Sequence, residues 1–473
     1  MTEILTITDA AAALRSGAIT SRELTEQAFA VADACDAAVG SYIATYRDHA
    51  LDAADQADAA LSQGRDLGPL QGIPVGIKDI ISTKEGTTTA QSLVLDREWG
   101  SSQGDAVVVA RLRAAGAVIT GKLTTMEYAC GMPDFDRPFP IPRNPWSLDH
   151  WAGGSSSGSG SSVSTGMVLG ALGTDTAGSI RIPASFCGVT GVMPTFGRVP
   201  KSGCVPLGYS LDHIGPLTRS ARDGAMMLAV LAGHDDSDAC SVDVPVPDYV
   251  SALTGDLSGL RIGVQRLEQY SGAFEDPSLP AAFDAAVQAL ADRGATIVPV
   301  ELPYYREMMA ANMIVFASEA AAYHMPDLKT RWLDYAPGTR GLMLSSFAIS
   351  AADYVQAQRA RRVAQRALAE TFADLDLIVT PTTAGGALAF DDLGSLLAQG
   401  GFDQIHTQYW DCTGNPATSV PMGFTAGGLP LGLQFAAKPF DEATMLRAAD
   451  AFQQHTDWHL QVPAIAALQP TGA

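Results

Sequence analysis

The spacing of apolar residues changes along the chain, and it predicts alternating helices and strands. Thr20 and Glu23 have the spacing of a capping box, in which each side chain satisfies a free backbone amide at the start of a helix. This helix is predicted over 20–35, and an alanine-rich helix over 48–62 ends just before a glycine. The apolar run over 69–81 contains one lysine and is predicted to include a buried strand.

The same patterns predict the remaining elements. Further helices are expected over 106–116, 220–231, 278–293, 308–373 with an interruption near Pro337, and 442–453. Further strands are expected over 117–120, 260–264, 295–300, 375–380 and 431–436, and residues 144–152 are predicted to form a loop. This alternation favours an α/β fold. No repeat of 20–50 residues and no proline-rich linker interrupts the chain, so we expect a single domain over 1–473.

Composition and charge exclude several classes of protein. The chain has 30 basic and 51 acidic residues and a net charge of −21, so no direct binding to nucleic acid is expected, because duplex binding needs a cationic surface. With 47% hydrophobic and 17% charged residues, the chain is too apolar to be intrinsically disordered. No signal peptide and no membrane helix are predicted, and the six cysteines are scattered without a CxxC pair. We therefore expect a reduced, cytoplasmic protein without a metal site.

The segment 153–162, Gly-Gly-Ser-Ser-Ser-Gly-Ser-Gly-Ser-Ser, has several possible interpretations. A flexible linker would join autonomous domains, whereas this segment continues directly into an apolar stretch. A phosphate-binding loop would end in Gly-Lys-Ser or Gly-Lys-Thr, which is absent here. A nucleophile elbow requires a strand immediately before it, and none is predicted. A buried backbone that needs small residues and holds hydroxyl groups for chemistry remains the preferred interpretation.

Several separated motifs point to one known family. The central ones are Gly-Gly-Ser-Ser over 153–156 and Gly-Thr-Asp-Thr-Ala-Gly-Ser-Ile-Arg over 173–181, and further motifs occur over 70–79, 191–199, 211–217, 414–421 and 428–434. Together they resemble the amidase signature family, which hydrolyses amides with a Ser–cis-Ser–Lys triad. The resemblance extends over roughly 20–459 and implies a layered α/β/α fold, with a mixed central β-sheet covered by helices and a signature core at about 70–220.

The resemblance also implies roles for individual residues. The nucleophile position falls on Ser179, the bridging serine on Ser155 and the base on Lys78. The oxyanion-hole donors fall on the backbone amides of Thr176, Ala177, Gly178 and Ser179. Each of the triad residues also has a purely structural interpretation. Lys78 could be a surface residue of an edge strand, Ser155 could bond to the backbone of a tight turn, and Ser179 could be a helix N-cap.

Two departures from the family pattern are visible. An alanine stands at 177 where many members have glycine, and Ser157-Gly158 stands where many have Gly-Gly. An alanine still supplies an N–H, provided that the backbone at 177 allows a Cβ atom. Asp175 and Arg181 are predicted to form a structural pair that braces this loop.

The chemistry explains why a lysine would stand in an apolar strand. A serine hydroxyl needs a base to take its proton before it attacks an amide. An ordinary lysine is protonated at neutral pH, but burial disfavours its ammonium form and lowers its pKa. A neutral Lys78 would take a proton from Ser155, which in turn would take one from Ser179 and later return it to the leaving amine.

The substrate is the least determined part of the prediction. The pocket is expected to come from the variable segments 125–143, 301–350 and 402–412, whose apolar and aromatic residues favour neutral groups. Its predicted wall residues are Met126, Tyr128, Met132, Phe135, Tyr409 and Trp410, the last two being equally consistent with the core. Four arginines could bind a carboxylate of the substrate, but no sequence pattern requires that role: Arg137, Arg143, Arg331 and Arg340.

Four functions remain open. The first is a hydrolase of aryl or alkyl amides that forms an acyl-enzyme on Ser179, and the second is a carbamate (urethane) hydrolase. The third is the glutamine-hydrolysing subunit of a tRNA-dependent amidotransferase, which needs partner subunits. The fourth is a non-catalytic binding member of the family, against which the joint presence of Lys78, Ser155 and Ser179 argues. No cofactor is implied, and a monomer or homodimer that acts on a small molecule away from membranes is expected.

Overall fold

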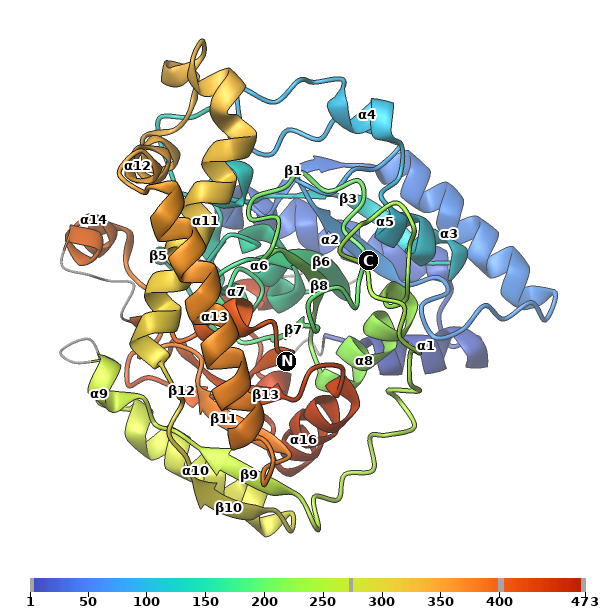
Figure 1. Cartoon of the computed structure of the whole chain (residues 1–473). Helices are drawn as coiled ribbons and strands as arrows, with labels where there is room; N and C mark the ends of the chain where they lie inside the picture. Colours follow the sequence, from blue (N-terminus) through green and yellow to red (C-terminus); the bar gives the residue numbers. More distant parts are fainter. Residues whose placement is uncertain (1–3, 272–274, 399–403, 469–473) are drawn as a thin grey trace.

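A mixed β-sheet runs through the centre of the computed structural model, which describes residues 4–271, 275–398 and 404–468 (Figure 1). Within these ranges, the strands of the sheet lie in the order β1 (Tyr42–Thr45), β3 (Val118–Leu123), β2 (Pro74–Lys78), β6 (Gly170–Asp175), β8 (His213–Thr218), β7 (Thr190–Met193), β12 (Ala417–Phe424), β13 (Pro430–Ala437), β11 (Leu377–Pro381), β9 (Arg261–Val264) and β10 (Thr296–Pro299). The strands β3, β2 and β6 are parallel neighbours, as are β11, β9 and β10, and the other pairs are antiparallel.

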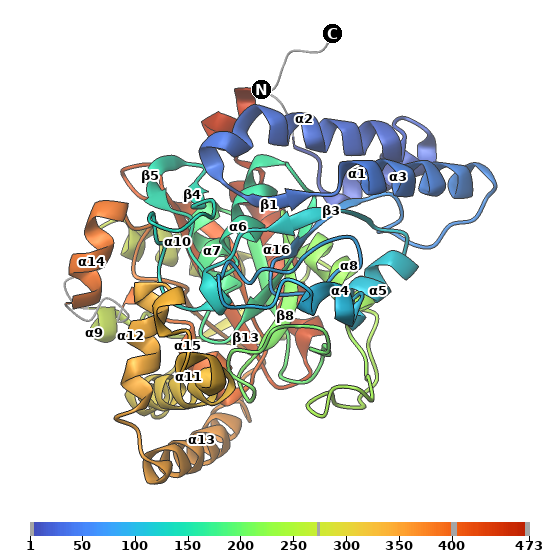
Figure 2. The ribbon, with the colours of Figure 1, turned by 90° about the horizontal axis from the view of Figure 1, so that it is seen from above.

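Helices surround the sheet, as the alternating pattern predicts. They are α1 (Ile7–Ser16), α2 (Ser21–Val39), α3 (Arg47–Ser62), α4 (Trp99–Gln103), α5 (Val107–Ala114), α6 (Ser157–Thr165), α7 (Arg181–Cys187), α8 (Ala221–Leu231), α9 (Glu268–Ser271), α10 (Leu279–Asp292), α11 (Tyr305–Leu328), α12 (Pro337–Ser346), α13 (Ala351–Thr371), α14 (Phe390–Ala398), α15 (Gln408–Thr413) and α16 (Glu442–His455). The pair α2 and α3 lies at one side of the molecule, and α11, α12 and α13 lie at the opposite side (Figure 2). The predicted α/β class with a mixed sheet is confirmed.

Local sequence signals determine where several of these helices begin. The hydroxyl of Thr20 accepts from the amide of Glu23, whose carboxylate accepts from Thr20 in return, so the predicted capping box forms. The helical region predicted over 308–373 is divided into α11, α12 and α13, with Pro337 as the first residue of α12. None of the helices in the described ranges is long and apolar enough to cross a membrane.

The glycine- and serine-rich segment is a buried helix, which the composition did not predict. The helix α6 covers most of it, and every residue of α6 is buried. A Cβ atom at Gly158 would overlap the carbonyl of Ser41, and one at Gly160 would press on Pro183. Small residues therefore let this helix pass close to its neighbours at the centre of the protein, and a flexible linker is excluded.

The segment before it was predicted incorrectly. The sequence predicts a loop over 144–152, but β4 (Arg143–Asn144) and β5 (Ser147–Trp151) pair as a separate two-stranded sheet. A tight turn joins them, and its Asn144 side chain accepts from the amide of Trp146. This short hairpin brings Trp151 to the wall of the site described next.

Candidate active site

Lys78 lies at the carboxyl end of β2, in the interior of the sheet. Its side chain is fully buried, and its Nζ atom donates to the hydroxyls of Ser155 at 2.7 Å, Ser156 at 2.9 Å and Thr174 at 2.7 Å. Thr174 is on the parallel neighbour β6, so the carboxyl ends of two adjacent parallel strands meet here. This edge of a sheet is where α/β proteins commonly place their ligand sites.

The surroundings of Lys78 favour its neutral form. Burial lowers its pKa from 10.5 to about 7, and the negative charges of Asp175 and Asp212 offset only part of this shift. Among the described residues, no carboxylate lies within ion-pair distance of Nζ, which contacts hydroxyl groups instead. With its pKa lowered to about 7, Lys78 can lose a proton near neutral pH, and as an amine it would donate to two of these three hydroxyls and accept from the third.

Ser155 lies in the turn between β5 and α6. The peptide bond between Gly154 and Ser155 is cis, as the family resemblance implied. A Cβ atom at Gly154 would overlap Met126 and Trp151, so only glycine fits before Ser155. The Ser155 hydroxyl contacts Lys78 and, as a hydroxyl, can donate and accept at the same time.

Ser179 follows β6 and precedes α7, and it lines the same cavity as Ser155. The carbonyl of Ser179 accepts from the amide of Ser156 at 3.1 Å, which ties the two serine-containing turns together. Ala177 and Ser179 are only half-buried, whereas the residues around them are buried. The structure thus brings Lys78, Ser155 and Ser179 to one place.

The loop over 176–179 is held by hydrogen bonds from several elements. The Thr176 hydroxyl donates to Asp212 at 2.7 Å, and its carbonyl accepts from Asn312 at 3.2 Å. The carbonyl of Ala177 accepts from the Thr407 hydroxyl at 2.6 Å. The loop is therefore rigidly positioned before any ligand binds.

The four predicted oxyanion donors are not equivalent. The amide of Gly178 donates to the carboxylate of Asp175, so it is already occupied. Neither Thr176 nor Gly178 lines the cavity, whereas Ala177 and Ser179 do, and in the described residues their amides have no acceptor. Of the four amides, those of Ala177 and Ser179 therefore belong to cavity-lining residues and have no acceptor within the described residues. The backbone φ at Ala177 is not positive, so its Cβ atom is tolerated.

A buried ionic cluster supports this loop from behind. Arg181 donates to Asp175 at 2.9 Å and to Asp411 at 2.5 Å, and the predicted pair of Asp175 with Arg181 is present. Burial alone would raise the pKa of Asp175, but the guanidinium of Arg181 holds it at about 2. Burial and the charge of Asp175 raise the pKa of Asp411 well above its usual value. Asp411 was not anticipated, because it is distant in sequence.

The cavity in front of the two serines is apolar and has a volume of about 410 Å³. It is lined by Met126, Ala129, Cys130, Gly131, Met132, Trp151, Gly154, Ser155, Ala177, Ser179, Ile182, Met313, Phe316, Gly338, Gly341, Leu342, Ser345, Ile405 and Gln408. None of these residues carries a charged side chain. Such a wall suits a neutral ligand with an apolar body.

Comparisons with known proteins agree with this geometry. A protein-family model described as Amidase matches residues 23–446. The chain belongs to the amidase family. It is therefore a serine hydrolase of the amidase signature type, an enzyme that acts on amide C–N bonds.

Individual relatives cover nearly all of the chain. A glutamyl-tRNA(Gln) amidotransferase subunit from Chloroflexus aurantiacus is 40% identical, over 98% of this chain and 100% of its own length. The native peptide amidase of Stenotrophomonas maltophilia has a TM-score of 0.83 at 30% identity, covering 97% and 98% of the two chains. A structure described as a vestigial complex that reveals the origins of an s-triazine catabolic enzyme has a TM-score of 0.87 at 31% identity, covering 95% and 98%.

The predicted wall residues of this amidase separate into two groups. Met126 and Met132 line the cavity, and all three variable segments contribute to it, although residues 402 and 403 lie outside the described residues. Tyr128, Phe135, Tyr409 and Trp410 are not among the lining residues, which corrects their prediction.

The four predicted residues that do not line the cavity pack elsewhere. Tyr128 packs against His324 with ring centroids 4.3 Å apart, and Phe135 lies on the surface against Phe390. Tyr409 and Trp410 are fully buried in the core. The polar wall residues Trp151 and Gln408 were missed, because no motif marks them.

The four arginines considered as possible carboxylate ligands do not line the cavity either. Arg137 donates to the carbonyls of Asp334 and Tyr335, and Arg331 donates to those of Leu93 and Val94. Arg143 lies against the rings of Phe135 and Phe390. In the described ranges, no group of three or more His, Cys, Asp or Glu side chains is arranged to hold a metal ion.

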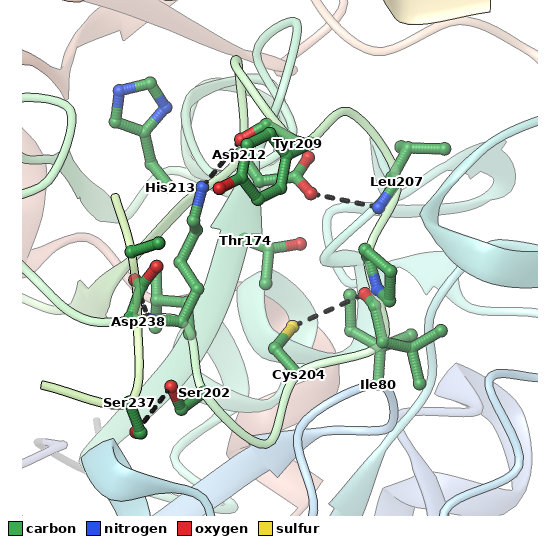
Figure 3. A pocket seen from close by; sticks show the side chains of 15 residues that line it. Ile80, Thr174, Ser202, Cys204, Leu207, Tyr209, Asp212, His213, Ser237 and Asp238 are labelled. Carbon is green, nitrogen blue, oxygen red and sulfur yellow. Dashed lines mark hydrogen bonds between the residues drawn. The ribbon is translucent and has the colours of Figure 1, made fainter. Parts of the chain in front are cut away.

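A second cavity, of about 270 Å³, has Thr174 of β6 in its wall (Figure 3). Thr174, which accepts from Lys78, faces it from β6, and Cys204, Asp212 and His213 surround it. Its wall contains charged side chains and neither Ser155 nor Ser179. The apolar cavity is therefore the candidate substrate site.

Replacing Gly178 by alanine is expected to damage both stability and turnover. Gly178 has φ +122°, and a Cβ atom there would overlap the Thr407 hydroxyl and press on Ile182. We expect a loss of about 1–3 kcal/mol in the free energy of unfolding and a fall in kcat of about 100-fold, because the loop must move. Urea denaturation and initial rates measure the two effects.

Gly17→Ala is the matched control for this substitution. Gly17 also has a positive φ, of +72°, but a Cβ atom there meets nothing within 4 Å. This variant should lose some stability and keep its turnover. Equal kcat values for wild type and Gly178→Ala would show that the loop over 176–179 does not set the rate.

Proposed function

We propose that this amidase hydrolyses neutral amides with an apolar aryl or alkyl group, through an acyl-enzyme on Ser179. The observation that supports this choice is that none of the described residues lining the cavity with Ser155 and Ser179 has a charged side chain. A charged substrate group would lose its hydration there without gaining a counter-ion. The whole chain would act as one domain on a small molecule.

The proposed mechanism assigns a role to each residue at the site. Neutral Lys78 takes a proton from Ser155, and Ser155 takes one from Ser179, whose oxygen attacks the amide carbon. The amides of Ala177 and Ser179 donate to the oxyanion that develops. The proton then returns through Ser155 to the leaving nitrogen, and water releases the acid by the same route.

Carbamates are the closest alternative substrates. Their carbonyl carbon also carries a nitrogen leaving group, and the same relay and amide donors would act on it. Among the described residues of the cavity wall, none favours amides over carbamates, so the ratio of the two rates must be measured.

A glutamine-hydrolysing subunit of an amidotransferase is the second candidate, and overall similarity favours it. The relative in Chloroflexus aurantiacus is named as part of such an amidotransferase and is 40% identical over nearly the whole chain. Such a function would require partner subunits and a cavity that accepts an amino acid with both a carboxylate and an ammonium group. The described lining residues, none of which has a charged side chain, argue against this substrate.

Hydrolysis by the single chain separates these functions. The purified chain is incubated with a chromogenic anilide, a matched aryl carbamate and glutamine, each with and without the partner subunits of a related amidotransferase. Release from the anilide or carbamate by the chain alone would support the proposal. Release of ammonia from glutamine only with partner subunits would transfer the assignment to the amidotransferase.

A further inference from the structure

One wall of the substrate cavity is a face of the helix α12. Four lining residues come from this helix, at the spacing i, i+3, i+4 and i+7 that places residues on one helix face: Gly338, Gly341, Leu342 and Ser345. Thr339 and Met343, which are buried, lie on the adjacent face. A side chain at position 341 would therefore extend from the face of α12 that borders the cavity.

The position of α12 is fixed by its neighbours. The amide of Ala336, directly before the helix, donates to the buried carboxylate of Glu127 at 2.7 Å, which also accepts from Ser92 at 2.8 Å. The helix lies alongside α11, which contributes Met313 and Phe316 to the same cavity (Figure 1). Turning the cavity face of α12 elsewhere would break these contacts.

Three of the four glycines among the described lining residues are explained by close packing. A Cβ atom at Gly131 would lie 2.9 Å from the amide nitrogen of Thr339, and one at Gly338 would lie 2.9 Å from the amide nitrogen of Met132. A Cβ atom at Gly154 would overlap two side chains. At these three positions, glycine allows neighbouring segments to approach each other closely.

The fourth glycine, Gly341, has no such explanation. Its φ is not positive, and a Cβ atom there would have no atom of the described residues within 4 Å. Glycine inside a helix destabilises it relative to alanine, because glycine loses more backbone freedom on folding. The structural consequence of glycine at this position is the open space on the cavity side of α12.

This side of the cavity is where it meets solvent. Gly341 and Ser345 are exposed, whereas Trp151 and Phe316 on other walls are buried. The hydroxyl of Ser345 donates to the carbonyl of Leu342 at 2.6 Å, so it is turned back onto its own helix. Small residues therefore border the opening of the cavity, and large apolar side chains border its interior.

We propose that Gly341 sets the width of the substrate cavity at this opening, so that the enzyme admits amides with a bulky apolar group such as a second ring. This inference rests on the proposed function and adds a limit of substrate size to it. A larger side chain at position 341 would occupy the open space and exclude bulky substrates by overlap, without removing any group of the proton relay. Gly341 is thus a specificity-determining residue.

The test measures kcat/KM for three anilides that share the same scissile bond. Acetanilide is the small reference, 4-phenylacetanilide adds a ring on the amine side, and 4-phenylbutyranilide adds one on the acyl side. The ratio of kcat/KM for each bulky anilide to that for acetanilide is compared between wild type and variants. Gly341→Leu is expected to lower at least one of the two ratios by about 10- to 100-fold, and Gly341→Ala by a smaller factor.

Gly394→Leu and Gly394→Ala are the matched controls. Gly394 is an exposed glycine inside α14, its φ is not positive, and a Cβ atom there would also have no atom of the described residues within 4 Å. It does not line the cavity, so both control variants should keep the two ratios of wild type. All four substitutions replace a helical glycine and should keep or raise the midpoint of thermal unfolding, which reports that each variant is folded.

Unchanged ratios for both bulky anilides in Gly341→Leu would overturn the inference, as would an equal change in Gly394→Leu. Hydrolysis of acetanilide alone by wild type would also overturn it, since the opening would then not admit a second ring.

If wild type hydrolyses none of the three anilides, the proposed function fails, and calorimetry decides the inference separately. The three compounds are then titrated into Ser179→Ala with and without Gly341→Leu. A Kd for a bulky anilide that rises at least about tenfold more than the Kd for acetanilide would support the role of Gly341. Equal changes in the three Kd values would overturn it.

Discussion

Replacing Ser179 by alanine is expected to lower kcat by about 10⁴- to 10⁶-fold. Under the proposed mechanism, the Ser179 oxygen forms the bond to the acyl group, and no other residue can replace it at that position. Binding should change little, because the cavity wall and the amides of Ala177 and Ser179 remain in place. Initial rates on an anilide, together with substrate binding to the inactive variant, measure the two quantities.

A nearby serine provides the control. Ser157 begins α6, is buried, and does not line the substrate cavity, so Ser157→Ala should keep turnover within a few-fold. Fragmentation mass spectrometry of wild type quenched during turnover of an activated ester should place the acyl group on Ser179 itself. An acyl group on Ser155, or undiminished turnover in Ser179→Ala, would refute the assigned nucleophile.

The strand that contains Lys78 was predictable because its sequence is unusual. A single lysine in a run of apolar residues is either an edge-strand residue or a buried residue with a function. The structure shows that Lys78 is fully buried with three hydroxyl partners. The positions of Ser155 and Ser179 depended on the family resemblance. The spacing of Ser155 and Ser179 along the chain does not by itself indicate that their two turns lie together in the fold.

The helix α6 could not be predicted from composition. Glycine and serine are weak helix formers, and a window rich in both is typical of a linker. Tertiary packing determines the outcome here, because the segment is surrounded on all sides and only small side chains fit against Ser41 and Pro183.

The cavity wall shows a second limit of sequence reasoning. Gln408, Tyr409 and Trp410 are consecutive in α15, but only Gln408 lines the cavity. Successive residues of a helix point about 100° apart, so a correct segment still gives the wrong face if the helix start is unknown. Tyr409 stacks on Tyr305 in the core, at 5.7 Å between ring centroids. The prediction identified the segment and missed the residue.

The rate of the wild-type enzyme is expected to rise with pH, with a midpoint of about 7. Burial lowers the pKa of Lys78 to about 7, so the neutral amine predominates above this pH and the inactive ammonium form below it. Values of kcat/KM between about pH 5 and about pH 9.5 should therefore increase and then level off. A profile without a midpoint near 7 in this range would show that burial does not lower the pKa of Lys78 enough for it to act as the base at neutral pH.

Substitutions of Lys78 separate its charge from its role as a base. Lys78→Met should lower kcat by about 10²- to 10⁴-fold, because no group then accepts the proton of Ser155. Lys78→Arg should be no better, since a guanidinium stays protonated throughout this range. Lys201→Met, in the second cavity, removes a lysine outside the relay and should leave the midpoint near 7. If Lys78→Met kept the pH dependence of wild type, the titrating group would lie elsewhere and the relay through Ser155 would be wrong.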